Sequence, residues 1–181
     1  MKKYNFVYSL YDDTLNLSKE YVSYVKLREH NFQKNSFYSK EKQQELIEKT
    51  INELENYIYR VIKNLNYSRY EFRDAWIQKY DKPGHFHDCH IHDPYLYSFV
   101  LYVDCSKQSA ETMFYNPGYP NYCTDTMRVK PKKGRCIIFN GAIPHAALPN
   151  FDKKRLVVSG NILITGNGSN HIAVETLIVG T

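Results

Sequence analysis

The sequence predicts a mainly β protein with helices only in its N-terminal third, and two patterns carry this prediction. Between residues 41 and 66, apolar residues recur at three- and four-residue steps: Ile47, Ile51, Leu54, Ile58, Ile62 and Leu65. This spacing is typical of an amphipathic helix that covers one face of a sheet. From residue 67 onward, short alternating apolar and polar runs are separated by Gly, Pro, Asn and Asp. Such a series predicts a barrel, a sandwich or a jelly roll.

The individual elements follow in chain order. YNFVYSLY (residues 4–11) predicts a short strand, YVSYVKLREH (21–30) a helix, and Ser39 an N-cap for the long helix. We expect core strands at 71–80, 96–104, 111–115, 126–130, 135–140, 155–164 and 171–179, with a hairpin turn of the Asn-Gly kind at 165–170. The prediction is one domain, residues 1–181, in which 1–66 form a helical support and 67–181 the β core.

Composition favours a cytoplasmic protein that acts on neither membranes nor nucleic acids. The 181 residues suffice for about one domain, and no apolar run approaches the roughly twenty residues that a membrane helix requires. The four cysteines show no CxxC spacing and are expected to be reduced thiols. The net charge is +5, but the basic residues are scattered. We expect the basic group around residues 128–135 to be a solvated loop.

Four of the seven histidines lie in HFHDCHIH, residues 85–92, between the turn signal DKPG and a predicted strand. Because residues i and i+2 of a strand point to one side, His90 and His92 can present two imidazoles to one metal ion. A catalytic site usually needs a third protein ligand, for which His145 is the candidate. We expect His85 and His87 to be exposed loop residues, and Cys89 to be a small buried residue on the opposite face from His90.

Arg155 is the candidate for binding an anionic cosubstrate. If residues 146–148 and 155–159 pair as a hairpin centred near Asn150, then His145 and Arg155 lie opposite each other with Cβ atoms about 5 Å apart. A buried arginine at that place needs an anion, and its planar fork binds a carboxylate through two parallel hydrogen bonds. Ser159 is expected on the same face as Arg155, where its hydroxyl adds a further contact.

The run from Trp76 through Gly84, HIH at 90–92, Ser98 and Tyr102 to ETMF, VKPKKGRCIIF, His145, Arg155 and Ser159 resembles the Fe(II)- and 2-oxoglutarate-dependent oxygenases. It is most similar to the small phage and bacterial branch with prolyl-hydroxylase-like members. The resemblance implies a double-stranded β-helix, the jelly-roll fold, with Fe(II) at its open end. It further implies a hydroxylase that uses 2-oxoglutarate and O2 and releases succinate and CO2.

Residue by residue, the resemblance assigns the metal to His90, His92 and His145, and the far carboxylate of 2-oxoglutarate to Arg155, with Ser159 and Tyr102. The family's usual motif is HxD or HxE, whereas this chain has HIHD. His92 therefore takes the place of the carboxylate, and Asp93 is the alternative second ligand. A neutral imidazole leaves one more positive charge on the site than a carboxylate would.

Three other functions stay open. A cupin with a three-histidine site, acting as a dioxygenase or isomerase, fits Gly84 and HIH but leaves Arg155 unexplained. A jelly-roll binding module without turnover is compatible with HIH in place of HxD. A nucleic-acid dealkylase fits less well, because only one arginine follows His145. The substrate, a small molecule or a peptidyl side chain, is not specified by any motif, and we expect residues 1–40 and 115–127 to select it.

Overall fold

The computed structural model describes residues 1–5, 9–28, 40–117, 119, 121, 125–152 and 154–166. The predicted N-cap Ser39, the predicted 165–170 turn beyond Gly166 and the predicted strand at 171–179 lie outside these residues. The helices are α1 (Lys19–Arg28) and α2 (Lys40–Leu65). The strands are β1 (Lys2–Asn5), β2 (Ser9–Thr14), β3 (Arg69–Lys79), β4 (His85–His90), β5 (Tyr97–Cys105), β6 (Thr112–Tyr115), β7 (Thr126–Val129), β8 (Arg135–Asn140), β9 (His145–Asn150) and β10 (Arg155–Thr165).

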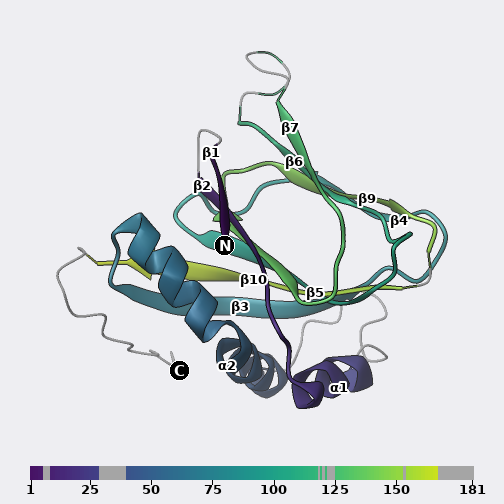
Figure 1. The fold of residues 1–181 in the computed structure, drawn as a ribbon, viewed down its shortest axis with the longest axis horizontal. Coiled ribbons are helices and arrows are strands. Elements are labelled where there is room, and N and C mark those ends of the chain that lie inside the picture. Colours follow the sequence, from purple (N-terminus) through teal and green to yellow (C-terminus); the bar gives the residue numbers. More distant parts are fainter. Residues whose placement is uncertain are drawn as a thin grey trace.

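These strands form two antiparallel sheets that face each other. The larger sheet has the order β1-β2-β8-β5-β10-β3, and the smaller has the order β4-β9-β6-β7. Figure 1 shows the smaller sheet above the larger one, with both helices on the far side of the larger sheet. Consecutive strands such as β3 and β4, or β9 and β10, belong to different sheets. This alternation between two sheets is the arrangement of a jelly roll.

Two apolar cores lie on the two faces of the larger sheet. On the helix side, α2 places Leu54, Ile58 and Ile62 against that sheet, and all three are fully buried. Between the sheets, a second cluster includes Val100, Phe114, Phe139 and Val157. The amphipathic stripe therefore covers a sheet, as predicted, and the strand alternation separates the helix side from the barrel interior.

The N-terminal segment contributes strands as well as helices. The predicted single strand at 4–11 is wrong: β1 and β2 are antiparallel partners in which Asn5 lies opposite Ser9. Strand β2 then pairs with β8 and extends the larger sheet. The alternation of apolar residues was read correctly as β structure, but no Gly, Pro or Asn-Gly signal marks the reversal of the chain.

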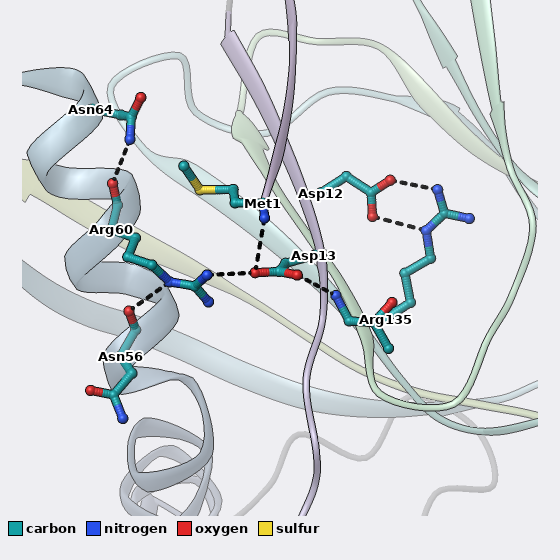
Figure 2. Close-up of polar contacts among 8 residues, drawn as sticks. Met1, Asp12, Asp13, Asn56, Arg60, Asn64 and Arg135 are labelled. Carbon is teal, nitrogen blue, oxygen red and sulfur yellow. Dashed lines mark hydrogen bonds and ion pairs between the residues drawn. The ribbon is translucent and has the colours of Figure 1, made fainter.

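Charged residues attach this hairpin to α2 and to β8. Figure 2 shows Arg60 of α2 reaching Asp13, with Nη1 and Oδ2 2.8 Å apart, and Arg135 of β8 paired with Asp12. Arg135 donates from Nε to Oδ1 of Asp12 at 2.9 Å and from Nη2 to Oδ2 at 2.5 Å. Asp12 is 5% exposed, so its buried charge is neutralised by a bidentate partner. Arg135 is therefore not a residue of a purely solvated loop.

None of the described helices is long and apolar enough to cross a membrane.

Candidate metal centre

Three histidines converge where the ends of β4 and β9 meet. His90 is the last residue of β4 and His145 the first of β9, and the antiparallel register places them directly opposite each other. His92 lies two residues beyond β4, in a segment held by a 2.8 Å bond from its backbone N–H to the carbonyl of Gly141. One ring nitrogen from each of the three histidines lies within 4.8 Å of the other two. Such a cluster can bind a divalent ion on one side and leave other coordination positions open.

The hydrogen bonds of His90 and His145 orient both rings toward a common point. His90 Nδ1 lies 2.7 Å from the carbonyl oxygen of Asp88, and His145 Nδ1 lies 3.0 Å from that of Ile143. A carbonyl only accepts hydrogen bonds, so each Nδ1 carries the proton and each Nε2 keeps a lone pair for a metal. Burial, with the neighbouring His90, lowers the pKa of His145 to about 3 and that of His92 to about 4. These rings are therefore neutral, which is the form that binds metal ions.

The residues around the cluster bear on the open alternative between His92 and Asp93 and differ from two other predictions. Asp93 is exposed and accepts a hydrogen bond from the backbone of Tyr95, so the structure brings His92 rather than Asp93 to the cluster. Cys89 is exposed rather than buried, because the outer face of the edge strand β4 has no covering layer among the described residues. His85 and His87 belong to β4 rather than to a loop. His87 is half-buried, and its ring stacks on that of His90 with centroids 4.1 Å apart.

Arg155 does not pair with His145 in a hairpin, and that prediction is wrong. The chain between Asn150 and Arg155 passes from one sheet to the other, so Arg155 lies on β10 opposite Cys105 of β5. The turn residues around Asn150 were read as a hairpin, although the same residues also occur where a jelly roll changes sheets. Across the barrel interior, Arg155 and the three histidines nevertheless line one pocket.

The guanidinium of Arg155 is buried with two of its three nitrogens unpaired. The residue is 2% exposed, and its Nη2 donates to Oγ1 of Thr112 at 2.8 Å. Its carbon Cζ lies 4.2 Å from the centroid of the Tyr80 ring. Nε and Nη1 have no hydrogen-bond partner among the described residues. Because a buried cationic donor without an acceptor is costly, this geometry calls for an anion that the pocket does not itself supply.

The two other residues predicted to bind the cosubstrate, Ser159 and Tyr102, differ in whether they line the pocket. Ser159 lines the pocket and lies four residues after Arg155 on β10, on the same face of the strand. Tyr102 is fully buried, is not among the pocket-lining residues, and shares a 2.5 Å hydrogen bond with the hydroxyl of Thr112. Its hydroxyl therefore contacts Thr112, which itself lines the pocket.

Sequence reasoning missed several residues of the pocket. Trp76, Gln78 and Tyr80 line it from β3 and the residue after that strand, at the two-residue spacing of one strand face. Thr112 on β6 is a fourth. The spacing at 76, 78 and 80 is visible in the sequence and could have identified the first three. Thr112 gives no such signal, because its role depends on contact between two sheets.

The pocket is lined by both polar and apolar side chains, with Arg155 as the charged residue among them. No Asp or Glu is among its lining residues in the described chain, whereas four histidines and Arg155 are. Phe139, Ala147 and Val157 supply apolar surface. The cavity at its centre has a volume of about 30 Å³.

The fold and this pocket define a class, a jelly roll with a metal-binding cluster at one end of the barrel. No protein-family model matches the chain, and no curated protein matches it. Among solved structures, the 2-oxoglutarate complex of a viral collagen prolyl hydroxylase from Paramecium bursaria Chlorella virus-1 aligns with 20% identity and a TM-score of 0.58. The alignment covers 86% of this chain and 95% of that one.

Two further solved structures have the same architecture. A prolyl-4-hydroxylase from Pseudomonas putida aligns with 14% identity and a TM-score of 0.57, over 86% of this chain and 88% of that one. SnoN, a non-heme α-ketoglutarate-dependent epimerase from nogalamycin biosynthesis, aligns with 13% identity and a TM-score of 0.62, over 95% and 86%. The chain thus has the fold of the Fe(II)/2-oxoglutarate oxygenases, and the fold expected from the sequence resemblance is confirmed.

Proposed function

We propose that this protein is an Fe(II)- and 2-oxoglutarate-dependent oxygenase that hydroxylates a small-molecule or peptidyl substrate. One observation carries the proposal: Arg155 directs unpaired, buried donors into the same pocket as a three-histidine cluster. A metal site alone is common to many jelly rolls. A metal site combined with a buried carboxylate receptor fits a cosubstrate that chelates the metal at one end and carries a free carboxylate at the other.

The donor set fits a divalent iron ion. His90, His92 and His145 would hold Fe(II) through three neutral imidazole nitrogens, which are suitable ligands for this metal. Three neutral ligands leave the whole charge of the ion uncompensated, whereas a motif with Asp in place of His92 would cancel part of it. The near carboxylate of 2-oxoglutarate would bring one negative charge to the metal, while the far carboxylate would pair with Arg155. The exchange of a carboxylate for His92 is thus compatible with binding of a dianionic cosubstrate.

Arg155 and Thr112 would hold the far carboxylate of 2-oxoglutarate. In a guanidinium Nη2 forms a fork with Nε on one side and with Nη1 on the other, so a carboxylate would accept from one of the unpaired nitrogens together with the second N–H of Nη2. The hydroxyl of Thr112 accepts from Nη2 of Arg155 and contacts the Tyr102 hydroxyl. With Tyr102 as donor, the Thr112 proton is left to point at the cosubstrate. Ser159 lines the pocket between Arg155 and the far end of β10, where its hydroxyl can reach the chain of the cosubstrate.

The residues of this chain bind, orient and shield the reacting groups. Bound Fe(II) with 2-oxoglutarate and O2 supplies the oxidising power that hydroxylates a C–H bond and releases succinate and CO2. The carbonyl partners of His90 and His145 fix those rings, so the ligand geometry does not depend on the metal. Phe139 and Val157, which also line the pocket, would contribute apolar surface beside the reacting centre. We place this reaction in the cytoplasm of a bacterial or phage-infected cell.

The cupin alternative accounts for three histidines but gives Arg155 no ligand. A non-catalytic binding module would keep both the three histidines and the buried Arg155. Only an experiment can distinguish such a module from an active oxygenase. Anaerobic titration of the Fe(II)-loaded protein with 2-oxoglutarate is therefore the first test, because chelation produces a visible metal-to-ligand charge-transfer band. We expect the band in the wild type, weakened in Arg155→Ala and in His92→Ala, and unchanged in Arg128→Ala, whose side chain is 63% exposed.

The outcomes of this titration differ for each alternative. A band followed by succinate formation in air supports the oxygenase, whereas a band without turnover favours the binding module. Stoichiometric iron without a band favours the cupin-type site. Absence of iron binding would show that the three histidines are not a metal centre.

A further inference from the structure

Asp74 lies on the barrel face of β3, one step beyond the residues that line the pocket. Trp76 and Gln78 of the same strand line the pocket, and the two-residue alternation puts Asp74 on the same face. The register pairs Asp74 with Asn161 and Trp76 with Ser159. Arg155 marks the end of the barrel where the cosubstrate would bind. Trp76 lies further along the paired strands β3 and β10, at the level of the metal ligands, and Asp74 lies beyond it. Asp74 is half-buried, which places it toward the solvent end of this series.

Fixed neighbours hold the carboxylate of Asp74 in one orientation. Its Oδ1 accepts hydrogen bonds from the backbone N–H and from Nδ2 of Asn161, both at 2.9 Å. Its Oδ2 receives only a 3.1 Å contact from the same Nδ2. The amide of Asn161 is fixed in turn by Ser98, whose hydroxyl donates to Oδ1 at 2.7 Å and which lines the pocket. One oxygen of Asp74 thus retains capacity to accept a further hydrogen bond.

The negative charge of Asp74 has no positive partner in the described chain. None of the described Lys, Arg or His side chains forms an ion pair with it, although the protein carries 24 Lys and Arg residues. Asp12, by contrast, is neutralised by Arg135. Desolvation raises the pKa of the Asp74 carboxyl, so its position is unfavourable for charge. An asparagine would accept the two bonds that Oδ1 receives without that cost, whereas its amide nitrogen could not accept the 3.1 Å contact at Oδ2. The bonds at Oδ1 alone therefore do not explain a carboxylate.

The residue between Asp74 and the metal cluster is the indole of Trp76. Its ring centroid lies 6.0 Å from that of His92, and the residue is half-buried. The flat face of an indole attracts cations, and a carboxylate binds them through charge-assisted hydrogen bonds. Side chains two residues apart on a strand are about 7 Å apart along it. A group bound at Asp74 would thus be joined by a short aliphatic chain to a carbon at the metal.

We propose that Asp74 and Trp76 form a subsite for a positively charged group of the substrate, a primary amine or a guanidinium. The assignment of this group to the substrate of an oxygenase rests on the proposed function, whereas the binding itself does not. The substrate class is accordingly a free or peptidyl residue with a basic side chain, in which the C–H bond presented to the metal lies a few bonds from the cation.

Trp76 is the single tryptophan of the chain, so its fluorescence reports on this subsite without any turnover. We would load the full-length protein with Zn(II) and 2-oxoglutarate and titrate it with two matched pairs of probes. L-lysine is compared with L-norleucine, and L-arginine with L-citrulline, because each pair shares its length and differs in charge. We expect the charged member of at least one pair to bind about tenfold or more tightly, as a charge-assisted hydrogen bond is worth that factor.

Two variants locate the preference. Asp74→Asn keeps the shape of the side chain and should abolish the discrimination between the charged and neutral probes. Glu71→Gln is the control on the same strand, because Glu71 already pairs with Arg73 at 2.8 Å, and it should keep the discrimination. Thermal unfolding shows whether each variant is folded. If Asp74→Asn does not fold, the comparison of charged and neutral probes in the wild type still tests the proposal.

Equal affinity for both members of both pairs in the wild type overturns the proposal, and so does a preference that survives in folded Asp74→Asn. Failure of the proposed function is seen separately, in the charge-transfer titration. A preference for the charged probes without the charge-transfer band would support the subsite and contradict the proposed oxygenase function. A band without that preference would support the oxygenase function and contradict the subsite.

Discussion

Replacing Arg155 by methionine should weaken 2-oxoglutarate binding strongly while leaving the ligand-free protein at least as stable. Nε and Nη1 are the unpaired donors, and each hydrogen bond to a charged group contributes about 1.5–3 kcal/mol. Loss of two such bonds corresponds to about 3–6 kcal/mol, or a factor of roughly one hundred to twenty thousand in Kd. Without 2-oxoglutarate, the buried guanidinium donates to Thr112 among the described residues and has the Tyr80 and Tyr102 rings beside it, but no carboxylate. Exchanging such a charge for an apolar side chain of similar length should change the free energy of unfolding by about 0 to +1 kcal/mol.

Both quantities are read from unfolding curves. In the Zn(II)-loaded wild type, 2-oxoglutarate at one hundred times its Kd should add about 2.7 kcal/mol to the free energy of unfolding, and in Arg155→Met it should add almost nothing. Arg135→Met is the matched control, because it leaves Asp12 buried and unpaired and should cost about 2 kcal/mol or more. If Arg155→Met instead loses stability comparable to Arg135→Met and keeps its response to 2-oxoglutarate, the guanidinium is structural and the reasoning is refuted.

Three further predictions concern the metal ligands and the barrel wall. His92→Asp should retain Fe(II) binding, whereas His92→Ala, with one ligand fewer, should lose on the order of a hundredfold in affinity, as measured by quenching of tryptophan fluorescence. The metal-free protein should lose about 2 kcal/mol of stability between pH 7.5 and pH 5 from His145 alone, because its pKa is lowered from 6.5 to about 3 on folding, and His92, whose pKa is lowered to about 4, adds a loss of the same sign. The unfolded chain then binds protons that the folded chain does not, so urea unfolding should show stability falling as pH falls below about 6.5; a flat profile would contradict the burial of a neutral His145. Gly160→Ala should cost about 1–3 kcal/mol in the same assay, because an added Cβ would lie 2.3 Å from the backbone oxygen of Asp74; an unchanged midpoint would show that β3 and β10 can separate there.

The sequence predicts local structure here better than it predicts which strands are neighbours. The stripe on α2 and the short apolar runs of β5, β8 and β10 are properties of single segments, and each was read correctly as helix or strand. The hairpin proposed around Asn150 failed because turn residues specify that the chain bends but not which sheet the next strand joins. The β1–β2 reversal was missed because no turn residue marks it.

The same distinction holds for the candidate site. The HIH motif and His145 were identified from residue type and spacing, and the structure brings their ring nitrogens together. Arg155 was identified from chemistry, as a cation expected among buried strand residues, although the geometry proposed for it was wrong. Thr112 and Tyr80 were not identified, because their contacts with Arg155 arise only when β6 and β3 meet β10 in space. Cys89 was misplaced for the converse reason: a strand at the edge of a sheet can have one face in solvent.

The pocket is bounded on one side by the free edges of both sheets, β3 in the larger and β4 in the smaller. Among the described residues, Gln78 and His87 join these edges by a single side-chain contact, with Nε2 and Nδ1 3.3 Å apart. Widening the barrel along this seam would break no ladder hydrogen bond. Within each sheet, neighbouring strands are joined by continuous pairing, as between β5 and β10 or β4 and β9. A bulky substrate can therefore be accommodated by separation of the β3 and β4 edges, which leaves the pairing within both sheets intact.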